Sequence, residues 1–359
     1  MGAVDEPIDL PTLKQWQTTE RREGEPLHLK IPLPATESGK YLRRCPDAAC
    51  APGKFLVDAS VTRRPDGTAR ENPRLVCPYC GLDDDILRFT DPEDIRYARE
   101  QVEWAARRDL QAAIEDALRS CEFESSGSGM FRVSCKFTPA PPVPRPSEPE
   151  REDLLRNMTC GSCSANYGVW SLALFCPACG ACALVDHQRR EAELAMAVVD
   201  EAVLRAGERG GEYVHRQLSN AHEDVVSAME VTCKAAYVYV AQKRLAAGQP
   251  PVSLDVANAF QSVARGRKMF AYLGVDPFGG LAASDLAWLG EAIQRRHVIA
   301  HNAGVIDGKY SNAVQGAVEG EVAQVTSADI RRFLAIIETV VVTLTSQLPE
   351  LQEHERRDA

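Results

Sequence analysis

The sequence has 359 residues, of which 45% are hydrophobic, and a formal net charge of −10 at pH 7. This length allows about two or three domains with apolar cores, and the acidic balance excludes a protein that binds nucleic acid over its whole surface. Because there is no apolar run of the ~20 residues that cross a membrane and no signal peptide in residues 1–6, we expect a cytoplasmic protein without a membrane partner. Residues 1–40 are polar and broken by prolines, which predicts an extended segment.

The first module is predicted over residues 41–138 and contains two cysteine pairs. These are Cys45-Pro46-Asp47-Ala48-Ala49-Cys50 and Cys77-Pro78-Tyr79-Cys80-Gly81. Short runs at Lys54–Val57 and Arg74–Val76 predict strands between the pairs. Four thiolates brought together by two tight turns make a tetrahedral zinc site. We therefore expect a structural zinc ion in a zinc-ribbon-like module, with the ligands Cys45, Cys50, Cys77 and Cys80.

A charged helix is predicted over residues 91–120, and it begins at Asp91-Pro92. Its many arginines allow two interpretations. Together with Trp104 they could form a face that binds nucleic acid. Alternatively, they form a solvated face with ion pairs to the glutamates of the same helix.

Two further features complete the N-terminal half. Residues 121–138 alternate around Ser125-Ser126-Gly127-Ser128-Gly129, which predicts a hairpin. Its Cys121 and Cys135 could pair, join a metal site or remain buried free thiols. Residues 139–150 are rich in proline, which predicts a stiff linker and a domain boundary.

A second zinc ribbon is predicted over residues 151–187, where both cysteine pairs have the C-x2-C spacing. They are Cys160-Gly161-Ser162-Cys163 and Cys176-Pro177-Ala178-Cys179, with strand-like residues between them. Cys182 or His187 could substitute for one ligand, although the regular set is complete without them. Pairing within each module is the simplest arrangement, and cross-pairing between the modules is the alternative. The expected ligands of the second zinc ion are Cys160, Cys163, Cys176 and Cys179.

From residue 188 the apolar spacing is helical, which predicts an all-α domain over residues 188–350 and a flexible tail over residues 351–359. Breaks at Gly207, Gly248 and Gly274 separate three helices. A fourth ends at Gly304, a loop runs to about residue 327, and a last helix follows. The fold class expected is a multidomain α+β protein, with two zinc-ribbon-like β modules followed by a helical bundle.

The fourth helix carries Arg295-Arg296-His297-Val298-Ile299-Ala300-His301-Asn302 close to its C-terminus. Arg296 keeps its charge and can clamp a phosphate, while His301 titrates near neutral pH and can carry a proton. Five residues place the two side chains about 140° apart on an ideal helix, so they share a cleft only if a second helix packs alongside. An arginine and a histidine suffice to cleave RNA by attack of its 2′-hydroxyl, without a metal. The basic clusters Arg265-Gly266-Arg267-Lys268 and Arg295-Arg296 are the expected contacts with RNA.

This region resembles the HEPN superfamily, whose ribonucleases carry R-x4-6-H with a polar residue after the arginine, here His297. Asn302, Gly304, Asp307 and Tyr310 match a run that follows the histidine in many members. The resemblance covers residues 188–350. It implies a helical homodimer with both motifs in one cleft, products with a cyclic phosphate, and a role as a toxin or anti-phage effector.

The resemblance also adds two expectations about single residues. Glu230, midway along the second predicted helix, lies where an acidic residue assists the motif in some members, and Asn302 lies beside the histidine. A solvated carboxylate is the alternative for Glu230. This chain has Ala303 where some members carry a tyrosine that a partner adenylylates, which argues against that mode of control.

Three functions compete. The first is a metal-independent endoribonuclease that uses Arg296 and His301, with zinc modules that recognise the RNA or a protein or phage trigger. The second is a non-catalytic adaptor that dimerises through its helices and binds protein or nucleic acid. The third is a zinc protein that binds nucleic acid mainly through residues 41–187, against which the low positive charge there argues.

Overall fold

The structure is a computed structural model in which the described residues are 10–18, 28–62, 68, 70–120, 123–124, 134–149 and 156–352. The chain divides into two compact units. One consists of Met1–Leu42 and Thr90–Asp153, and the other of Arg43–Phe89 and Leu154–Ala359. None of the helices in the described part is long and apolar enough to cross a membrane. The tail from residue 353 and the side chains of Cys121 and Cys135 lie outside the described residues.

The first unit is built on the long helix α2 (Pro92–Arg119), to which Asp91 is the N-cap through a 2.9 Å bond from the Glu93 amide. Asp109 accepts the Thr12 amide at 2.9 Å and so holds the short helix α1 (Pro11–Lys14). Arginines of α2 pair with glutamates one turn away, as Arg96 does with Glu100. These pairs favour the solvated-face interpretation of the helix. The unit also contains the antiparallel pair β5 (Phe123–Glu124) and β6 (Ser134–Cys135) at the predicted hairpin.

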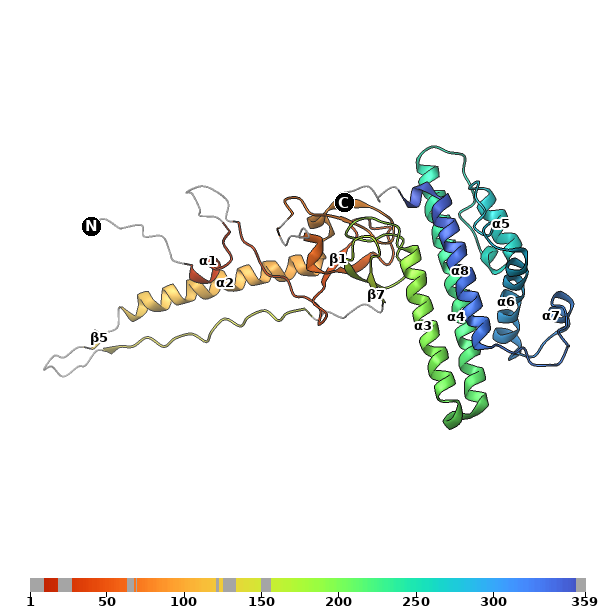
Figure 1. Ribbon diagram of the computed structural model, residues 1–359. Helices are drawn as coiled ribbons and strands as arrows, with labels where there is room; N and C mark the ends of the chain where they lie inside the picture. The colour runs from red at the N-terminus through yellow and green to blue at the C-terminus, as the bar shows by residue number, and fades with distance from the viewer. Residues whose placement is uncertain are drawn as a thin grey trace. The chain divides into compact units, whose positions relative to one another are not determined.

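The proline-rich segment lies along α2 rather than forming a free linker (Figure 1). The Trp104 indole N–H donates to the Val143 carbonyl at 3.0 Å, and the Gln111 amide donates to the Ala140 carbonyl at 3.2 Å. The guanidinium of Arg145 lies 5.5 Å from the centre of the Trp104 ring. Proline-rich backbone makes no internal hydrogen bonds, so its carbonyls are free to accept from side chains of the helix.

The two cysteine-rich regions share one antiparallel sheet, with strand order β1-β2-β8-β7. The central pairing joins Phe55 to Val169 and Val57 to Tyr167, and all four side chains are buried. This arrangement differs from the two separate modules expected from the proline-rich boundary, because strand pairing links segments more than 100 residues apart. The strands are β1 (Tyr41–Arg44), β2 (Lys54–Val57), β7 (Arg156–Thr159) and β8 (Asn166–Val169). A separate two-stranded sheet holds β3 (Arg74–Val76) and β4 (Asp83–Asp85).

The remainder of the second unit is helical, as expected. Figure 1 shows α3, α4 and α8 lying lengthwise against one another, with α5 and α6 beside them. The α-helices are α3 (Leu184–Leu204), α4 (Ala206–Ala246), α5 (Val263–Ala271), α6 (Ala283–Asn302), α7 (Gly308–Ala313) and α8 (Ser327–Gln347). The 3-10 helices are η1 (Ala59–Thr62), η2 (Ile86–Phe89), η3 (Ala259–Gln261) and η4 (Pro349–Leu351).

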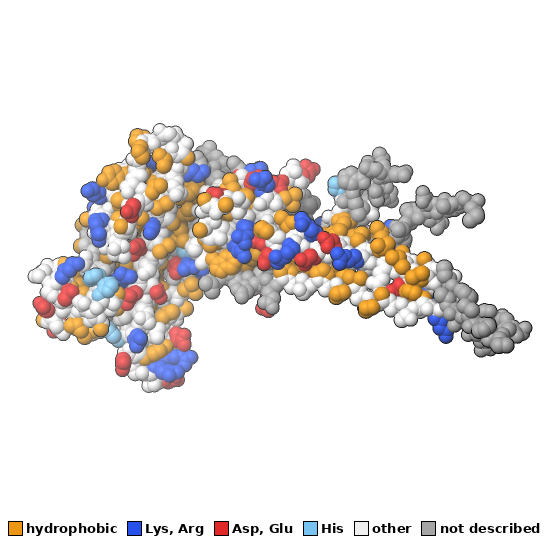
Figure 2. All heavy atoms as spheres, turned by 180° about the vertical axis from the view of Figure 1, so that it is seen from behind, with side chains coloured by type: hydrophobic (Ala, Val, Ile, Leu, Met, Phe, Trp, Pro, Cys, Tyr) orange, Lys and Arg blue, Asp and Glu red, His pale blue; other side chains and the backbone are white. Residues whose placement is uncertain are grey.

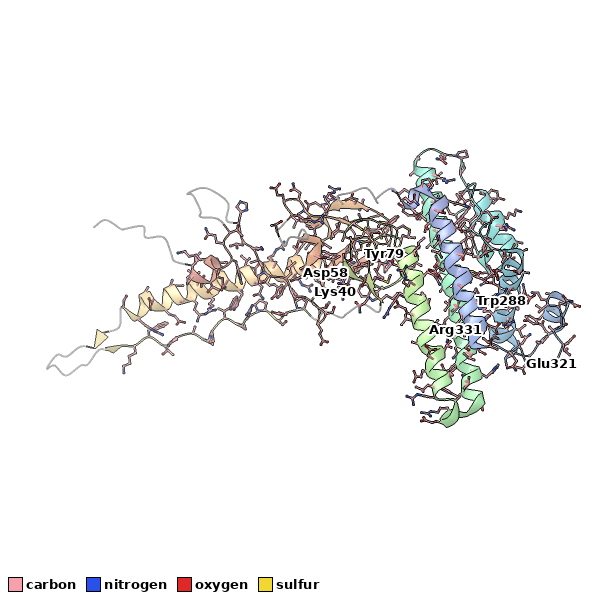
Figure 3. All side chains as sticks on the ribbon, in the orientation of Figure 1. Lys40, Asp58, Tyr79, Trp288, Glu321 and Arg331 are labelled. Carbon is pink, nitrogen blue, oxygen red and sulfur yellow. The ribbon has the colours of Figure 1, made fainter. Side chains whose placement is uncertain are left out.

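Side-chain contacts fix the directions of the central helices. Arg295 and Arg332 contact Asp329 and Asp285 respectively, so α6 and α8 are antiparallel. On α6, Trp288 (labelled in Figure 3) packs edge-on against Phe333 of α8, with the ring centres 5.8 Å apart. α4 runs parallel to α8, because His222 lies 5.5 Å from the Phe333 ring while Arg244 pairs with Glu350. α4 and α6 are therefore antiparallel.

A further element differs from the sequence-based expectation. The predicted loop before residue 327 contains α7, whose N-cap Asp307 accepts the Tyr310 amide at 2.8 Å. Ile306, Tyr310, Val314 and Ala323 pack with Val298 of α6 into a small separate core. The segment after α6 is therefore folded back onto that helix.

Candidate functional site

The first four-cysteine group brings Cys45, Cys50, Cys77 and Cys80 together. Their ligand atoms lie within 4.8 Å of one another, with sulfur–sulfur distances of 3.7 Å for Cys45–Cys80 and 3.6 Å for Cys50–Cys77. A tetrahedron with metal–sulfur bonds of about 2.3 Å has sulfur–sulfur edges of about 3.8 Å. The group therefore has the dimensions of a tetrahedral metal site.

The second group consists of Cys160, Cys163, Cys176 and Cys179, with a 3.8 Å Cys160–Cys179 distance and a 3.7 Å Cys163–Cys176 distance. Each group is thus drawn from one of the two cysteine-rich regions, and no cross-paired group occurs among the described cysteines. Hydrogen bonds within the group lower the pKa of Cys160 and raise the pKa values of Cys176 and Cys179. The thiols therefore share protons within one cluster.

Tight turns aim the sulfurs at a common point. In three of the four turns, the residue after the second cysteine has a left-handed backbone: Gly81 (φ 70°), Ser164 (φ 59°) and Gly180 (φ 75°). The Gly81 amide donates to the Cys77 carbonyl at 3.0 Å, and the Gly180 amide to the Cys176 carbonyl at 2.9 Å. Tyr79 ties the first turn to the sheet, because its hydroxyl donates to the Lys54 carbonyl at 2.7 Å (Figure 3).

Neither alternative ligand lies in a metal group. Cys182 packs against the helical core, and His187 accepts a 2.9 Å hydrogen bond from Arg156 at its Nε2 atom. The four cysteines of the second group are complete without them.

The arginine–histidine motif occupies the last turns of α6. The helix ends at Ala303 (φ 51°) and Gly304 (φ 82°), and the Gly304 amide donates to the Val298 carbonyl at 3.2 Å. The helix begins after Ala282, which is its N-cap residue. This left-handed end exposes the motif and turns the chain back towards α7.

The two adjacent arginines have different surroundings. The Arg295 side chain is 14% exposed, lies 3.5 Å from the Asp329 carboxylate and has the Tyr310 hydroxyl 3.5 Å from its Nε atom. Arg296 makes no ion pair with any described residue, and its buried Nε atom has no hydrogen-bond partner among them. Arg295 thus belongs to the scaffold, while Arg296 retains the capacity to bind an anion.

Two histidines, His297 and His301, share the last turns of α6 with Arg296. The ring centres of His297 and His301 are 4.6 Å apart, and both residues are exposed. Partial burial, His301 and the Lys309 ammonium lower the pKa of His297. Figure 2 shows histidine side chains at the surface of the helical region among lysine and arginine side chains.

The Asn302 side chain forms a hydrogen bond within the protein. Its amide nitrogen donates to Asp307 at 2.9 Å, and the other Asp307 oxygen accepts the Tyr310 amide at 2.8 Å. These bonds lower the pKa of Asp307. Asn302 therefore fastens the start of α7 to the end of the motif helix.

Glu230 is not brought to the motif. It accepts the Gln261 side-chain amide at 3.2 Å on both oxygens. His222 of α4 donates to the Ala292 carbonyl of α6, so these two residues lie side by side on the antiparallel helices. Glu230 lies eight residues beyond His222 in one direction, and Arg296 lies four residues beyond Ala292 in the other. At about 1.5 Å per residue, Glu230 and Arg296 are therefore about 18 Å apart along the helix axes.

The basic stretch Arg265-Gly266-Arg267-Lys268 is partly neutralised. Arg267 binds Asp276, with its Nε atom 3.0 Å from one carboxylate oxygen. Lys309, in contrast, is an exposed cation close enough to affect the titration of His297. Its place in the sequence gave no sign of this, because the folding-back of α7 is what brings it to the motif.

Comparisons of the chain with protein-family models, with curated proteins and with solved structures found no match.

Proposed function

We propose that this protein is a metal-independent endoribonuclease of the HEPN type, in which Arg296 and His301 act on the RNA backbone. The observation that carries the proposal is the state of Arg296, which has no ion pair among the described residues and shares the last turns of α6 with two exposed histidines. A guanidinium without a partner next to a proton carrier suits a phosphodiester substrate.

The reaction follows from these groups. His301 takes the proton from a ribose 2′-hydroxyl, whose oxygen attacks the adjacent phosphorus and displaces the 5′-oxygen of the next nucleotide. A second imidazole, from His297 or from a partner subunit, gives the departing oxygen a proton. Arg296 neutralises the charge that builds up on the phosphate. The products are a 2′,3′-cyclic phosphate and a free 5′-hydroxyl.

The remaining parts of the protein have supporting roles in this proposal. Each four-cysteine group holds a structural zinc ion, for which four thiolates are a common ligand set. The helical domain forms a homodimer that brings two motifs into one cleft. The sheet recognises RNA or a protein or phage trigger, which makes the protein a toxin or defence effector in the cytoplasm.

The test is cleavage of RNA by the purified, metal-loaded protein in EDTA, with native mass spectrometry to verify that both bound metals remain. Arg296→Ala and His301→Ala should each reduce cleavage at least 100-fold, on the order of the loss when a catalytic acid or base is removed. The matched controls are Arg331→Ala and His28→Ala, which alter exposed residues outside the motif. Cleavage that survives both motif substitutions contradicts the proposal.

The adaptor hypothesis makes the opposite prediction. It requires binding of protein or nucleic acid without cleavage, and binding that is the same in Arg296→Ala, in His301→Ala and in the unsubstituted protein. Separating intact RNA from fragments with cyclic phosphate ends distinguishes the two functions.

A further inference from the structure

Lys309 is an exposed lysine on α7, the short helix that folds back onto the end of the motif helix α6. It forms no ion pair with any described residue. Of the acidic side chains nearby, Asp307 already accepts hydrogen bonds from Asn302 and from the Tyr310 amide. The Glu319 carboxylate lies close to the start of α7 but is not paired with the lysine. Lys309 therefore keeps its capacity to bind an anion.

The backbone on both sides of Lys309 is held against α6. Two residues before it, Asp307 accepts the Asn302 amide at 2.9 Å. Directly after it, Tyr310 is 5% exposed and packs with Val298 of α6. The flexible side chain of Lys309 is thus attached at a fixed point beside the motif.

The order of residues around α6 places the two histidines between two cations. At about 100° per residue, Arg296, His297, His301 and Val298 follow one another around the helix. Because Val298 packs in one core with α7, α7 lies on the side of the histidines that is away from Arg296. Lys309 acts on His297 from that side, since its ammonium helps to lower the pKa of the ring.

Two cations on either side of a cleavage site suit a polymer of phosphates. An RNA strand carries one phosphate per nucleotide, so two neighbouring phosphates can be bound at the same time. In the function proposed above, Arg296 holds the scissile one. A lysine is a compact point charge on a flexible stem, and its contact with a phosphate fixes the position of the strand without reading the bases.

We propose that Lys309 is a positioning residue that binds the RNA phosphate next to the scissile one. The substrate class is then an RNA chain with at least two successive phosphates, and its bases are not read at this point. The inference rests on the proposed function, because Arg296 and His301 define which phosphate is scissile.

Binding of 2′-O-methyl RNA tests this site without cleavage, because the blocked 2′-oxygen cannot attack. The full-length, metal-loaded protein is titrated into a labelled 2′-O-methyl oligonucleotide at several salt concentrations, and fluorescence anisotropy gives the affinity. Lys309→Ala should weaken binding about fivefold, as expected for one exposed charge pair. It should also reduce the salt slope of the affinity by about 0.7, the value for one phosphate contact with a single strand. Lys309→Arg keeps the charge and should restore both quantities.

The matched control is Lys234→Ala, at an exposed lysine of α4 that lies beyond Glu230 on the side away from the motif. It should bind the oligonucleotide as the unsubstituted protein does, and all these variants should keep the same Tm. Unchanged affinity and salt slope in Lys309→Ala would overturn the proposal. So would an equal weakening in Lys234→Ala, which would indicate a general effect of charge.

Cleavage of short substrates distinguishes this site from the catalytic groups. Lys309→Ala should leave kcat/KM unchanged for a dinucleotide with a single phosphodiester, and lower it about fivefold for a trinucleotide. An equal loss with both substrates would place Lys309 on the scissile phosphate and overturn the proposal. If unmodified RNA stays intact while Lys309→Ala still weakens binding, the proposed function fails and the phosphate site at Lys309 stands.

Discussion

The imidazole rings of His297 and His301 lie 4.6 Å apart at the exposed end of α6, with an angle of 60° between their planes. Residues four apart share one face of a helix, so both rings face the same side. Arg296 and Lys309 both help to lower the pKa of His297. His297, His301 and Arg296 at the end of α6 thus lie near Lys309 of α7, and the two cations affect the titration of His297.

Substitution of Arg295 should lower the stability of the protein, whereas substitution of Arg296 should abolish its cleavage of RNA. Arg295→Ala removes the ion pair with Asp329 and should cost about 1–2 kcal/mol of unfolding free energy. Arg296→Ala removes a guanidinium whose buried Nε has no described partner, so the unfolding free energy should change little or rise, while cleavage is lost. Urea unfolding and RNA cleavage measure the two effects. A large loss of stability in Arg296→Ala would assign this arginine to the scaffold instead.

Substitutions of Asn302 and Asp307 should distinguish a structural role of Asn302 from a direct contact with RNA. If its amide only fastens α7, Asn302→Ala should lower kcat/KM by a few fold, and by no more than Asp307→Ala, which also removes the N-cap bond from the Tyr310 amide. The double substitution should then be no worse than Asp307→Ala alone, because that substitution already removes the shared bond. A much larger loss for Asn302→Ala than for Asp307→Ala would mean that the amide contacts RNA directly.

Two buried histidines should make folding stability depend on pH. Burial lowers the pKa of His187 and of His222 to about 4, below the unfolded value of about 6.5. The unfolded chain therefore takes up these protons first. Stability is fully present above about pH 6.5 and falls as the pH drops towards 4, by up to ~3 kcal/mol for each histidine.

His222→Phe should flatten this dependence, since phenylalanine keeps a ring against Phe333. His28→Phe, at an exposed position, is the control and should leave the pH dependence unchanged. Urea unfolding at pH 7, 6, 5 and 4 measures both. If the His222→Phe curve is parallel to that of the unsubstituted protein, His222 does not titrate below its usual range.

The shared sheet should couple the two metal groups. Because β2 pairs with β8, loss of one ligand in either group should loosen both ends of the sheet. Cys50→Ser and Cys163→Ser should therefore each lose both bound metals, whereas Cys182→Ser should keep both. Native mass spectrometry counts the metals, and circular dichroism checks that the helices remain. Loss of a single metal in each variant would mean that the groups are independent.

Local sequence determined much of this protein. The spacing of the cysteines determined the two metal groups, because tight turns with a left-handed residue such as Gly81 or Gly180 aim sulfurs at one point. Apolar periodicity predicted the helices of the C-terminal half, and Asp91-Pro92 predicted the start of α2. These features depend on residues a few positions apart, which a sequence displays directly.

Only the tertiary structure decided which groups are free and which are engaged. Two neighbouring arginines look alike in sequence, yet Asp329, from a helix more than 30 residues later, pairs with Arg295 and leaves Arg296. The two cysteine-rich regions lie in one sheet because β2 pairs with β8. Glu230 lies far from the motif because α4 and α6 run in opposite directions. Contacts between distant segments depend on packing of the whole chain, so no local pattern encodes them.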